Sequence, residues 1–451
     1  MSSAAHRATG HDHSAPDDRP GPGGLWSVQD HLDDILATVR PLEPIELHLL
    51  DAQGCVLVDD VTVPVSLPPF DNSSMDGYAV RVTDVAGASE EFPAVLEVVG
   101  DVAAGQAEPP TVGPGQAARI MTGAPLPPGA ETVVPVEWTD GGLGEGPAAG
   151  MRARSLAPEG AEGQVRVYRP AEAGAHVRTA GSDVRAGDRA LRAGTVLGPA
   201  QIALLAAIGR GRVRVRPRPR VVVLSTGSEL VQPDEELAPG QIYDSNSFAL
   251  TAAARDAGAI AYRVGAVADD AETLRSTIED QLVRADLMVT TGGVSVGAYD
   301  VVKEALEHVA DEDEPGSGVE FRKLAMQPGK PQGFGSIGPD HTPLLALPGN
   351  PVSSYVSFEL FVRPAIRTLM GLPDVHRPTA TATLAADTAL TSPKGRRQFL
   401  RGRLGDGSVT PVGGAGSHLV AALAQADALI VVPEDTESVE PGAEVEVVLL
   451  R

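Results

Sequence analysis

The chain has 451 residues and a formal net charge of −24, from 36 basic and 60 acidic residues, and we expect about three domains of roughly 150 residues each. This charge argues against nucleic acid as the main partner, because such binding depends on Lys and Arg that neutralise phosphates, but it is compatible with a local basic site for an anionic small molecule. The single cysteine, Cys55, excludes an internal disulfide and is typical of a cytoplasmic protein.

The N-terminal region begins with a polar tail. Residues 1–24 are rich in Ser, Ala, Asp, Pro, Gly and His, which predicts disorder, and they lack the apolar core of a signal peptide. No stretch of the sequence approaches a transmembrane span. Ser27 is a candidate N-cap for a helix whose apolar residues follow at helical spacing. Residues 45–50 alternate as a strand, and we expect a helix over 55–61.

The middle of the chain changes character twice. Residues 64–165 are rich in Pro and Gly and contain short β-like runs, which predicts a small β-rich domain. Residues 166–216 return to mixed structure, with a helix candidate at 199–208 and a basic strand at 212–216. In so acidic a chain, we interpret that strand as one with a solvated face and not as a nucleic-acid-binding stripe.

The C-terminal half predicts an α/β domain followed by a β domain. Over residues 217–374, short apolar strands alternate with helical patterns, which predicts a parallel, doubly wound sheet. Pro364 falls inside the last of these helices and should kink it. Residues 375–451 return to a β pattern, which we interpret as a small barrel or sandwich.

Residues 285–309 have the pattern of a strand, a glycine turn and a helix. Gly292 and Gly293 form the turn, where unpaired backbone N–H groups at the carboxyl end of a strand can hold a phosphate. Asp300 stands at the start of the helix, and a carboxylate beside a phosphate site is a natural magnesium ligand. The alternative is an ordinary β-to-α turn in which Asp300 caps the helix, and this stretch alone does not decide between the two.

A second glycine turn, Thr226-Gly227, follows the strand at 221–224 and precedes Glu229. Turns at the carboxyl ends of strands in a doubly wound sheet can face one crevice. Glu229 and Asp300 can therefore converge on one Mg²⁺, which usually takes one or two carboxylates plus phosphate oxygens. Asp269 precedes a helix of the same domain, where helix capping is the competing interpretation.

The tetrapeptide Pro348-Gly349-Asn350-Pro351 joins a strand to a helix. Pro351 stands near the first helical position, where its missing N–H is not needed. The two prolines fix a turn whose N–H groups, with the Ser353 hydroxyl, offer a preorganised site for a phosphate or another tetrahedral anion. Lys323 and Lys330, just upstream, add positive charge to this part of the chain.

Two loops of the β-rich region also carry polar side chains. FDNSSMDGYAV, at 70–80, includes Asp76, and IMTGAPLPPGA, at 120–130, ends a strand at Thr122. The first loop offers carboxylates and hydrogen bonds, and Thr122 can offer a hydroxyl to a phosphate. Turn formation explains the first loop, and a strand end explains the second, so neither loop indicates a function by itself.

Seven motifs occur together in this order: FDNSSMDGYAV, IMTGAP, STGSEL, QIYDSN, TGGVSVGAYD, QPGKP and LPGNPVSS. With this order and spacing the chain, outside its N-terminal tail, resembles the MoeA family of molybdopterin molybdenumtransferases. The resemblance implies four domains: a discontinuous linking and dimerisation domain at 25–63 and 166–216, an inserted β-rich domain at 64–165, a molybdopterin-binding-like α/β domain at 217–374, and a C-terminal β-barrel at 375–451.

The resemblance also implies a reaction. Its substrates are adenylylated molybdopterin and molybdate; molybdenum is placed on the dithiolene and AMP is released, with Mg²⁺ required. The implied enzyme is a cytoplasmic homodimer whose cleft lies between the α/β domain of one subunit and the inserted domain of the other. Other molybdenum cofactor biosynthesis proteins are expected as partners, and nucleic acid and membranes are not.

Residue by residue, the resemblance implies a catalytic set and a substrate-binding set. The catalytic set is Asp76, Thr122, Asp183, Glu229, Asp269 and Asp300, of which Glu229, Asp269 and Asp300 are also the implied metal ligands. The substrate-binding set is Thr226, Gly227, Gly292, Gly293, Ser295, Lys323, Lys330, Pro348, Gly349, Asn350, Pro351, Ser353, Arg401 and Ser417. Molybdate is an oxyanion that takes cationic and hydroxyl donors, which Lys323, Ser353, Arg401 and Ser417 supply.

One position departs from the family pattern. Gln327 stands where many members have a lysine, two residues before the glycine of PGKP, and Lys330 is a candidate to replace the lost charge.

Three alternatives stay open. The first is the preceding step, adenylylation of molybdopterin by a related α/β domain, although the additional domains and the PGNP turn favour the transferase. The second is a receptor-clustering scaffold, known from a fused animal relative whose domain linker has no counterpart here. The third is tungstate in place of molybdate, since the two oxyanions have nearly the same size and charge.

Overall fold

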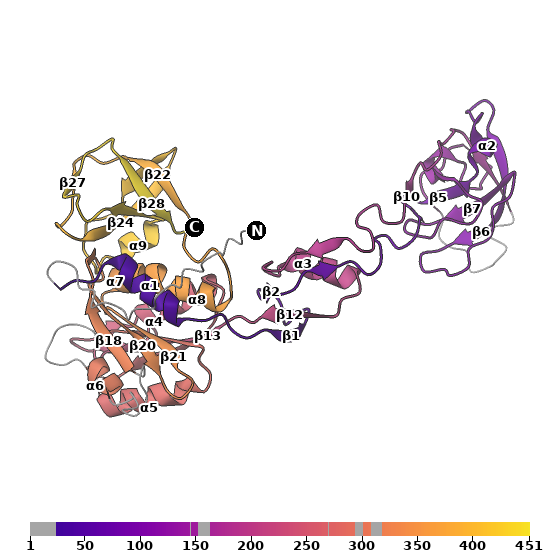
Figure 1. The fold of residues 1–451 in the computed structure, drawn as a ribbon. Coiled ribbons are helices and arrows are strands. Elements are labelled where there is room, and N and C mark those ends of the chain that lie inside the picture. Colours follow the sequence, from indigo (N-terminus) through magenta and orange to yellow (C-terminus); the bar gives the residue numbers. More distant parts are fainter. Residues whose placement is uncertain (1–23, 145, 152–162, 269, 294–300, 308–317) are drawn as a thin grey trace, which may run out of the picture. The chain divides into compact units, whose positions relative to one another are not determined.

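The computed structural model describes residues 24–144, 146–151, 163–268, 270–293, 301–307 and 318–451 (Figure 1). The chain forms two compact units. The first unit comprises Met1–Ile45, Gly54–Val56 and Val215–Arg451, and the second comprises Glu46–Gln53 and Leu57–Arg214. Except for Gly24, the tail predicted to be disordered lies outside the described residues. None of the described helices is long and apolar enough to cross a membrane.

The second unit is built on a five-stranded sheet, which confirms the predicted β-rich character. Its strands are β5 (Gly77–Val80), β6 (Ala94–Val102), β7 (Gln116–Ile120), β8 (Thr132–Pro135) and β9 (Gln164–Val167). Their order is β8-β5-β7-β6-β9. β6 and β7 are parallel, and the other neighbours are antiparallel. Apolar residues of these strands pack together on both sides of the sheet, so the region has cores of its own.

Shorter elements complete this part of the chain. They are β1 (Ile45–His48), β2 (Val56–Leu57), β3 (Val61–Thr62), β4 (Asn72–Ser73), α2 (Val82–Val85), a 3₁₀ turn (Val136–Trp138), β10 (Val177–Arg178), β11 (Arg189–Leu191), α3 (Pro199–Ala207) and β12 (Arg212–Arg216). The expected helix over 55–61 is wrong, because this segment forms β2, which pairs with β12, and β3, which pairs with β11. A short apolar run does not distinguish a strand from a helix by spacing alone.

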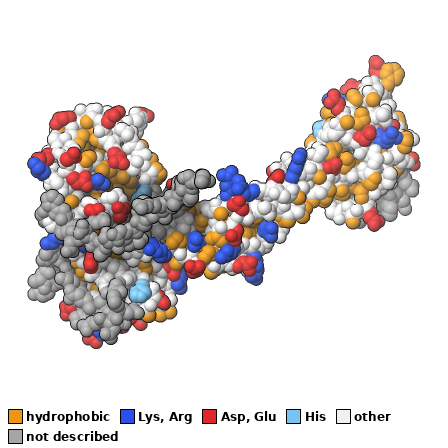
Figure 2. Space-filling model, in the orientation of Figure 1, with side chains coloured by type: hydrophobic (Ala, Val, Ile, Leu, Met, Phe, Trp, Pro, Cys, Tyr) orange, Lys and Arg blue, Asp and Glu red, His pale blue; other side chains and the backbone are white. Residues whose placement is uncertain are grey.

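The basic strand β12 has one solvated face, as predicted. Val213 and Val215 are buried, whereas the guanidinium groups of Arg212 and Arg214 lie 3.5 Å from Glu46 and 3.8 Å from Asp59. Acidic and basic side chains are interspersed over the face of the protein drawn in Figure 2. Arg212 and Arg214 are therefore matched by acidic neighbours, which argues against a nucleic-acid-binding stripe on this strand.

The first unit contains a six-stranded sheet with the order β16-β13-β17-β21-β20-β18. The strands are β13 (Arg220–Thr226), β16 (Ile260–Val267), β17 (Leu287–Thr291), β18 (Gly318–Lys323), β20 (Pro331–Ile337) and β21 (Thr342–Leu347). β16, β13, β17 and β21 are parallel, but β20 and β18 are antiparallel. The predicted parallel pairing does not hold at this edge, because the 338–341 turn between β20 and β21 is too short for a parallel crossover.

Helices cover both faces of this sheet (Figure 1), which confirms the doubly wound architecture. Successive side chains of a strand point to opposite faces. Val221 and Val223 of β13 accordingly enter one core and Val222 and Leu224 the other. The first core contains residues of α1 (Val28–Thr38), α4 (Asn246–Asp256), α7 (Pro351–Ser357) and α8 (Arg363–Leu369), and the second contains residues of α5 (Ala271–Leu282) and α6 (Val301–Glu307). The Ser27 hydroxyl accepts a hydrogen bond from the Asp30 backbone, as predicted for the N-cap of α1.

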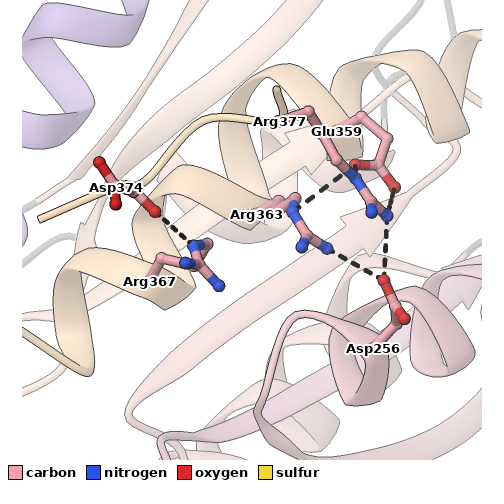
Figure 3. Close-up of polar contacts among 6 residues, drawn as sticks. All are labelled: Asp256, Glu359, Arg363, Arg367, Asp374 and Arg377. Carbon is pink, nitrogen blue, oxygen red and sulfur yellow. Dashed lines mark hydrogen bonds and ion pairs between the residues drawn. The ribbon is translucent and has the colours of Figure 1, made fainter. Parts of the chain in front are cut away.

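A π-helix, Phe358–Val362, lies between α7 and α8, just before Pro364, where the sequence predicts a kink. Glu359 of this segment has a side chain that is only 1% exposed. Figure 3 shows it held by Arg377, whose guanidinium lies 2.8 and 3.2 Å from the two carboxylate oxygens. Arg377 and Arg363 also bind Asp256 of α4, at 2.9 and 3.1 Å. This cluster attaches the connection after α8 to the helices beneath it.

The C-terminal domain is a closed five-stranded barrel, which decides between the barrel and the sandwich that were predicted. The strands are β22 (Thr379–Leu384), β24 (Arg397–Gly405), β25 (Ser408–Pro411), β26 (Ala428–Val432) and β28 (Glu444–Leu449). The ring β24-β25-β22-β28-β26 closes because β26 also pairs with β24. The other elements of the first unit are β14 (Leu230–Val231), β15 (Ile242–Tyr243), β19 (Met326–Gln327), which joins β24, β23 (Leu390–Thr391), β27 (Ser438–Val439) and α9 (Val420–Gln425).

Candidate active site

A cavity of about 940 Å³ opens at the carboxyl end of the parallel strands of the first unit. The pairing register sets Ser225, Thr291 and Leu347 side by side at the ends of β13, β17 and β21. The three turns that follow these strands therefore begin at the same edge of the sheet. They form the cavity wall together with the start of α4, the segment 326–331, and residues of the C-terminal barrel domain.

The turn after β17 requires glycine. Gly292 and Gly293 have φ angles of 101° and 64°, which L side chains rarely adopt. A Cβ atom at Gly292 would lie 2.5 Å from the carbonyl oxygen of Thr226, and one at Gly293 would lie 2.4 Å from Val302. A Cβ at Gly349 would lie 3.4 Å from the Cα of Gly292. The backbones of the three turns thus pack against one another with almost no side-chain volume between them.

The turn after β21 joins the sheet to the barrel domain. Pro351 is the first residue of α7, as the sequence predicts, and Asn350 is the N-cap. The backbone N–H of Val352 donates to the carbonyl oxygen of Ser417 at 3.0 Å. Ser353, which is 4% exposed, and Ser417 both line the cavity. The barrel therefore brings a hydroxyl to the PGNP turn.

Basic side chains on the cavity wall come from two domains. Lys330 belongs to the segment before β20, and Arg396 and His418 belong to the barrel domain. The guanidinium of Arg396 donates to Oε1 of Gln327 at 3.5 Å. Gln327, which departs from the family pattern, therefore has a cation as its neighbour.

Two carboxylates also face this region. Glu229 lies beside Gly227 and lines the cavity. Asp244 is 1% exposed and is bound from within the protein: it accepts hydrogen bonds from the Ser225 hydroxyl at 2.9 Å and from the Ser247 backbone at 3.1 Å. Glu229 is thus the carboxylate available to a ligand, whereas Asp244 supports the wall.

A buried hydroxyl on the cavity wall has no partner within the described part of the chain. Oγ1 of Thr226 makes no hydrogen bond there, although the residue is only 5% exposed. A Cβ atom at Gly292 would lie 2.8 Å from this oxygen, so the hydroxyl lies against the glycine turn. Leaving a buried hydroxyl unsatisfied costs about 1–3 kcal/mol, which a ligand with a hydrogen-bonding group would recover.

The structure brings most of the predicted first-unit residues together. The cavity is lined by Thr226, Gly227, Glu229, Gly292, Gly293, Lys330, Pro348, Gly349, Asn350, Pro351, Ser353 and Ser417. These residues come from segments far apart in the sequence, and the shared sheet edge is what assembles them.

Two predicted substrate-binding residues are not on the cavity wall. Lys323 is exposed at the end of β18. Arg401 is 3% exposed and donates to the carbonyl oxygens of Val412, Gly414 and Gly416. Burial lowers the pKa of Arg401. In this structure Arg401 supports the loop that carries Ser417, and a direct contact of Lys323 or Arg401 with substrate stays a prediction.

Three predicted residues belong to the second unit. Oδ1 of Asp76 accepts hydrogen bonds from the backbone N–H of Thr122 at 2.7 Å and from its hydroxyl at 2.9 Å. Asp183 is exposed, and its backbone N–H donates to Leu67. Asp76 and Thr122, which the sequence separates, therefore form one polar pair.

The predicted residues Asp269, Ser295 and Asp300 lie outside the described residues. Within the described ranges, no cluster of three or more His, Cys, Asp and Glu side chains could hold a metal ion. Glu229 is thus the member of the predicted metal set whose position is known. Its carboxylate on the cavity wall is the donor type that Mg²⁺ takes alongside phosphate oxygens.

The cavity residues that were not singled out from the sequence include Asp244, Asn246, Arg396 and His418. Asp244 and Asn246 lie in the QIYDSN motif, and the polar residues of that motif were a sequence signal that pointed to them. Arg396 and His418 had none, because a single arginine or histidine in a β domain is usually solvated.

The sequence matches three family descriptions. Residues 26–209 match "MoeA N-terminal region (domain I and II)", residues 222–368 match "Probable molybdopterin binding domain", and residues 383–450 match "MoeA C-terminal region (domain IV)". Together these matches span nearly all of the chain outside its N-terminal tail.

Individual relatives and a solved structure are similar over most of the chain. A Mycobacterium tuberculosis protein (strain H37Rv) named "Molybdopterin molybdenumtransferase 2" is 46% identical over 425 residues, which cover 94% of this chain and 99% of the relative. A Bacillus subtilis protein (strain 168) named "Molybdopterin molybdenumtransferase" is 34% identical, with 89% of each chain covered. The crystal structure of a molybdopterin biosynthesis MoeA protein from Pyrococcus horikosii has a TM-score of 0.70 at 33% identity, with 95% of this chain and 99% of that chain covered.

Proposed function

The chain belongs to the MoeA family, and from that membership we propose that it is a molybdopterin molybdenumtransferase of molybdenum cofactor biosynthesis. The proposed reaction takes adenylylated molybdopterin and molybdate, places molybdenum on the dithiolene and releases AMP. One molybdate oxygen leaves as water with the two thiol protons, and molybdenum keeps its oxidation state. A water molecule hydrolyses the phosphoanhydride bond, so that the pterin keeps its own phosphate.

The observation that carries this proposal is a single cavity that is lined both by basic and hydroxyl side chains and by the three turns at the sheet edge. Lys330, Arg396 and His418 line this cavity together with Ser353 and Ser417. Molybdate is a dianion with four acceptor oxygens, and charge-assisted hydrogen bonds from such groups are roughly twice as strong as neutral ones. These five residues are the proposed binding site for molybdate.

The glycine turns suit the other substrate. Gly292 and Gly293 line the cavity, and as glycines they let a ligand approach the backbone closely. Turns at the carboxyl ends of parallel strands are the usual phosphate sites of doubly wound sheets. The unsatisfied hydroxyl of Thr226 adds a donor at this turn. We assign the pyrophosphate and pterin of the adenylylated substrate to this wall.

Magnesium is part of the proposal. Glu229, with Asp269 and Asp300, would hold the ion, and Glu229 fits because its carboxylate lines the cavity. When bound, the ion would draw negative charge from the pyrophosphate oxygens. The residues of the chain itself bind and orient the two substrates: the basic wall holds molybdate, and the glycine turns hold the phosphates.

A cytoplasmic homodimer is also part of the proposal. In it, Asp76 and Thr122 take part in the reaction as one hydrogen-bonded pair, since both bonds run to the same carboxylate oxygen. Light scattering of the purified protein measures the oligomeric state. A monomer at assay concentration would contradict the dimer.

The test is molybdate-dependent AMP release. Purified protein is mixed with adenylylated molybdopterin and Mg²⁺, with molybdate or with sulfate as an oxyanion control. AMP release that depends on molybdate supports the proposal, and its absence refutes it. A parallel reaction with molybdopterin and ATP tests the adenylylation alternative.

Arg396→Met tests the basic wall. We expect it to raise the half-saturating molybdate concentration by about tenfold, because one charge-assisted hydrogen bond to an anion is lost. Lys394→Met is the matched control, since Lys394 is exposed and pairs with Glu437 at 3.3 Å, away from the cavity. Equal effects of the two substitutions would refute the assignment of Arg396.

A further inference from the structure

One side-chain amide connects two turns of the cavity. Nδ2 of Asn246, the first residue of α4, donates to the carbonyl oxygen of Gly349 at 2.7 Å and to Oγ1 of Thr291 at 3.1 Å. Oγ of Ser354 lies 3.4 Å from the same nitrogen. The two stronger bonds use both amide hydrogens. They join the end of β17 to the turn after β21.

The hydroxyls of Thr291 and Ser354 extend this network to the first residue of the PGNP turn. The Thr291 hydroxyl lies 3.0 Å from the carbonyl oxygen of Pro348, and the Ser354 hydroxyl donates to the same oxygen. The two hydroxyl oxygens are 2.9 Å apart. Thr291 and Ser354 are each 1% exposed, so water does not compete for these bonds. The carbonyl groups of Pro348 and Gly349 are both held from behind the turn.

The start of α4 is itself held to the sheet. Asp244, two residues before Asn246, binds the Ser225 hydroxyl at the end of β13 and the backbone and hydroxyl of Ser247. This carboxylate is buried, and breaking a buried charge-assisted hydrogen bond is costly. The backbone of Asn246 is therefore held in place by Asp244, while its side chain binds the turns after β17 and β21.

We propose that Asn246 is the positioning residue of the oxyanion-binding wall. Its amide sets the Pro348–Pro351 turn against the Gly292 turn. The Pro348–Pro351 turn leads into α7, which carries Ser353 and whose Val352 backbone N–H donates to the carbonyl oxygen of Ser417. The effect of Asn246 on molybdate binding rests on the proposed function, whereas its effect on the position of the Pro348–Pro351 turn does not. Asn246 acts through the turn, and the chemistry is left to other groups.

The turn can be tested without any substrate. Hydrogen exchange followed by mass spectrometry reports the amides of residues 345–355 in the substrate-free protein. Asn246→Asp keeps the size of the side chain but removes both donors and sets a carboxylate against the carbonyl of Gly349. We expect exchange in 345–355 to become at least about tenfold faster, since two hydrogen bonds are lost. Gln281→Ala, which removes an amide from α5 outside the cavity, should leave it unchanged.

Exchange in Asn246→Asp that matches the wild type would overturn the inference. If this variant does not fold, Thr291→Val provides the second measurement: it removes the hydroxyl that links Asn246 to Pro348 and keeps the side-chain shape. We expect faster exchange at 345–355 there too, and wild-type exchange in Thr291→Val would also overturn the inference.

The kinetic measurement separates positioning from a general structural role. In a wild-type protein that releases AMP with molybdate, Asn246→Asp should raise the half-saturating molybdate concentration by about tenfold and leave the rate at saturation within about twofold of the wild type. A uniform loss of rate with unchanged half-saturation would overturn the positioning role. A wild-type protein without molybdate-dependent AMP release refutes the proposed function and leaves the exchange result standing.

Discussion

Arg377→Met tests the ion cluster of Figure 3, which holds the connection between the α/β domain and the barrel. Met keeps the apolar stem of the side chain and removes the guanidinium. Glu359 would then lie in the helix layer without its main partner, with Arg363 4.0 Å away and a hydrogen bond from the Tyr355 hydroxyl. Burial and the Glu359 charge raise the pKa of Tyr355, so that hydroxyl stays protonated and continues to donate.

The magnitude follows from the exposure of each partner. The Glu359 side chain is 1% exposed and that of Arg377 is 12% exposed, so water does not replace the lost bonds. Removing one partner of a buried pair costs about 3–5 kcal/mol. Because Arg363 and Tyr355 still contact Glu359, we expect a cost near the lower end, about 3 kcal/mol. Asp256 is 61% exposed, and Asp256→Asn should cost less than about 1 kcal/mol.

The assay is urea denaturation followed by tryptophan fluorescence. The chain has two tryptophans, Trp26 in the first unit and Trp138 in the second. In a Trp138→Phe background, fluorescence therefore reports only the unit that contains the cluster. The double variant Arg377→Met/Glu359→Met should recover most of the loss, because an apolar pair can replace a buried ion pair at little cost.

Two results would refute this reasoning. The first is a cost of Arg377→Met in free energy of unfolding that is no larger than that of Asp256→Asn, which would mean that solvent screens the Glu359 pair. Alternatively, the double variant could be no more stable than Arg377→Met alone, which would mean that the loss does not come from a stranded carboxylate.

Three further predictions concern other parts of the chain. Burial, with a smaller contribution from Arg322, lowers the pKa of His31 from 6.5 to about 3. Between these two pH values the unfolded chain binds a proton at His31 and the folded chain does not. The free energy of unfolding therefore falls as pH falls below about 6.5, by about 2 kcal/mol at pH 5. His31→Phe should remove this difference between pH 7.5 and pH 5 in urea titrations, and an unchanged difference would contradict it. Gln327→Lys should be tolerated, since it adds a cation beside Arg396 in a cavity proposed for an anion; abolished AMP release would show that the wall is not a generic cationic site. Asp300→Asn should lower AMP release and leave the dimer intact by light scattering, and an unchanged rate would remove Asp300 from the catalytic set.

Much of the fold follows from local patterns. The helix capped by Ser27, the apolar strands and the glycine turns are encoded by neighbouring residues, because periodicity and backbone preferences act over a few positions. The same reasoning failed at 55–61, where a short apolar run fits two structures, and at β18 and β20, where connection length decides strand direction. In both places the outcome depends on which strand lies alongside.

The candidate site divides in the same way. The sequence by itself determined the turns at Thr226, Gly292 and Pro348, since Gly and Pro restrict the backbone wherever they occur. Only the tertiary structure decided that Asn246 binds Gly349, 103 positions away, that Arg396 reaches Gln327, and that Arg401 turns into its own loop. Such contacts are set by the packing of distant segments around a shared sheet edge, and the local pattern of residues carries no record of that packing.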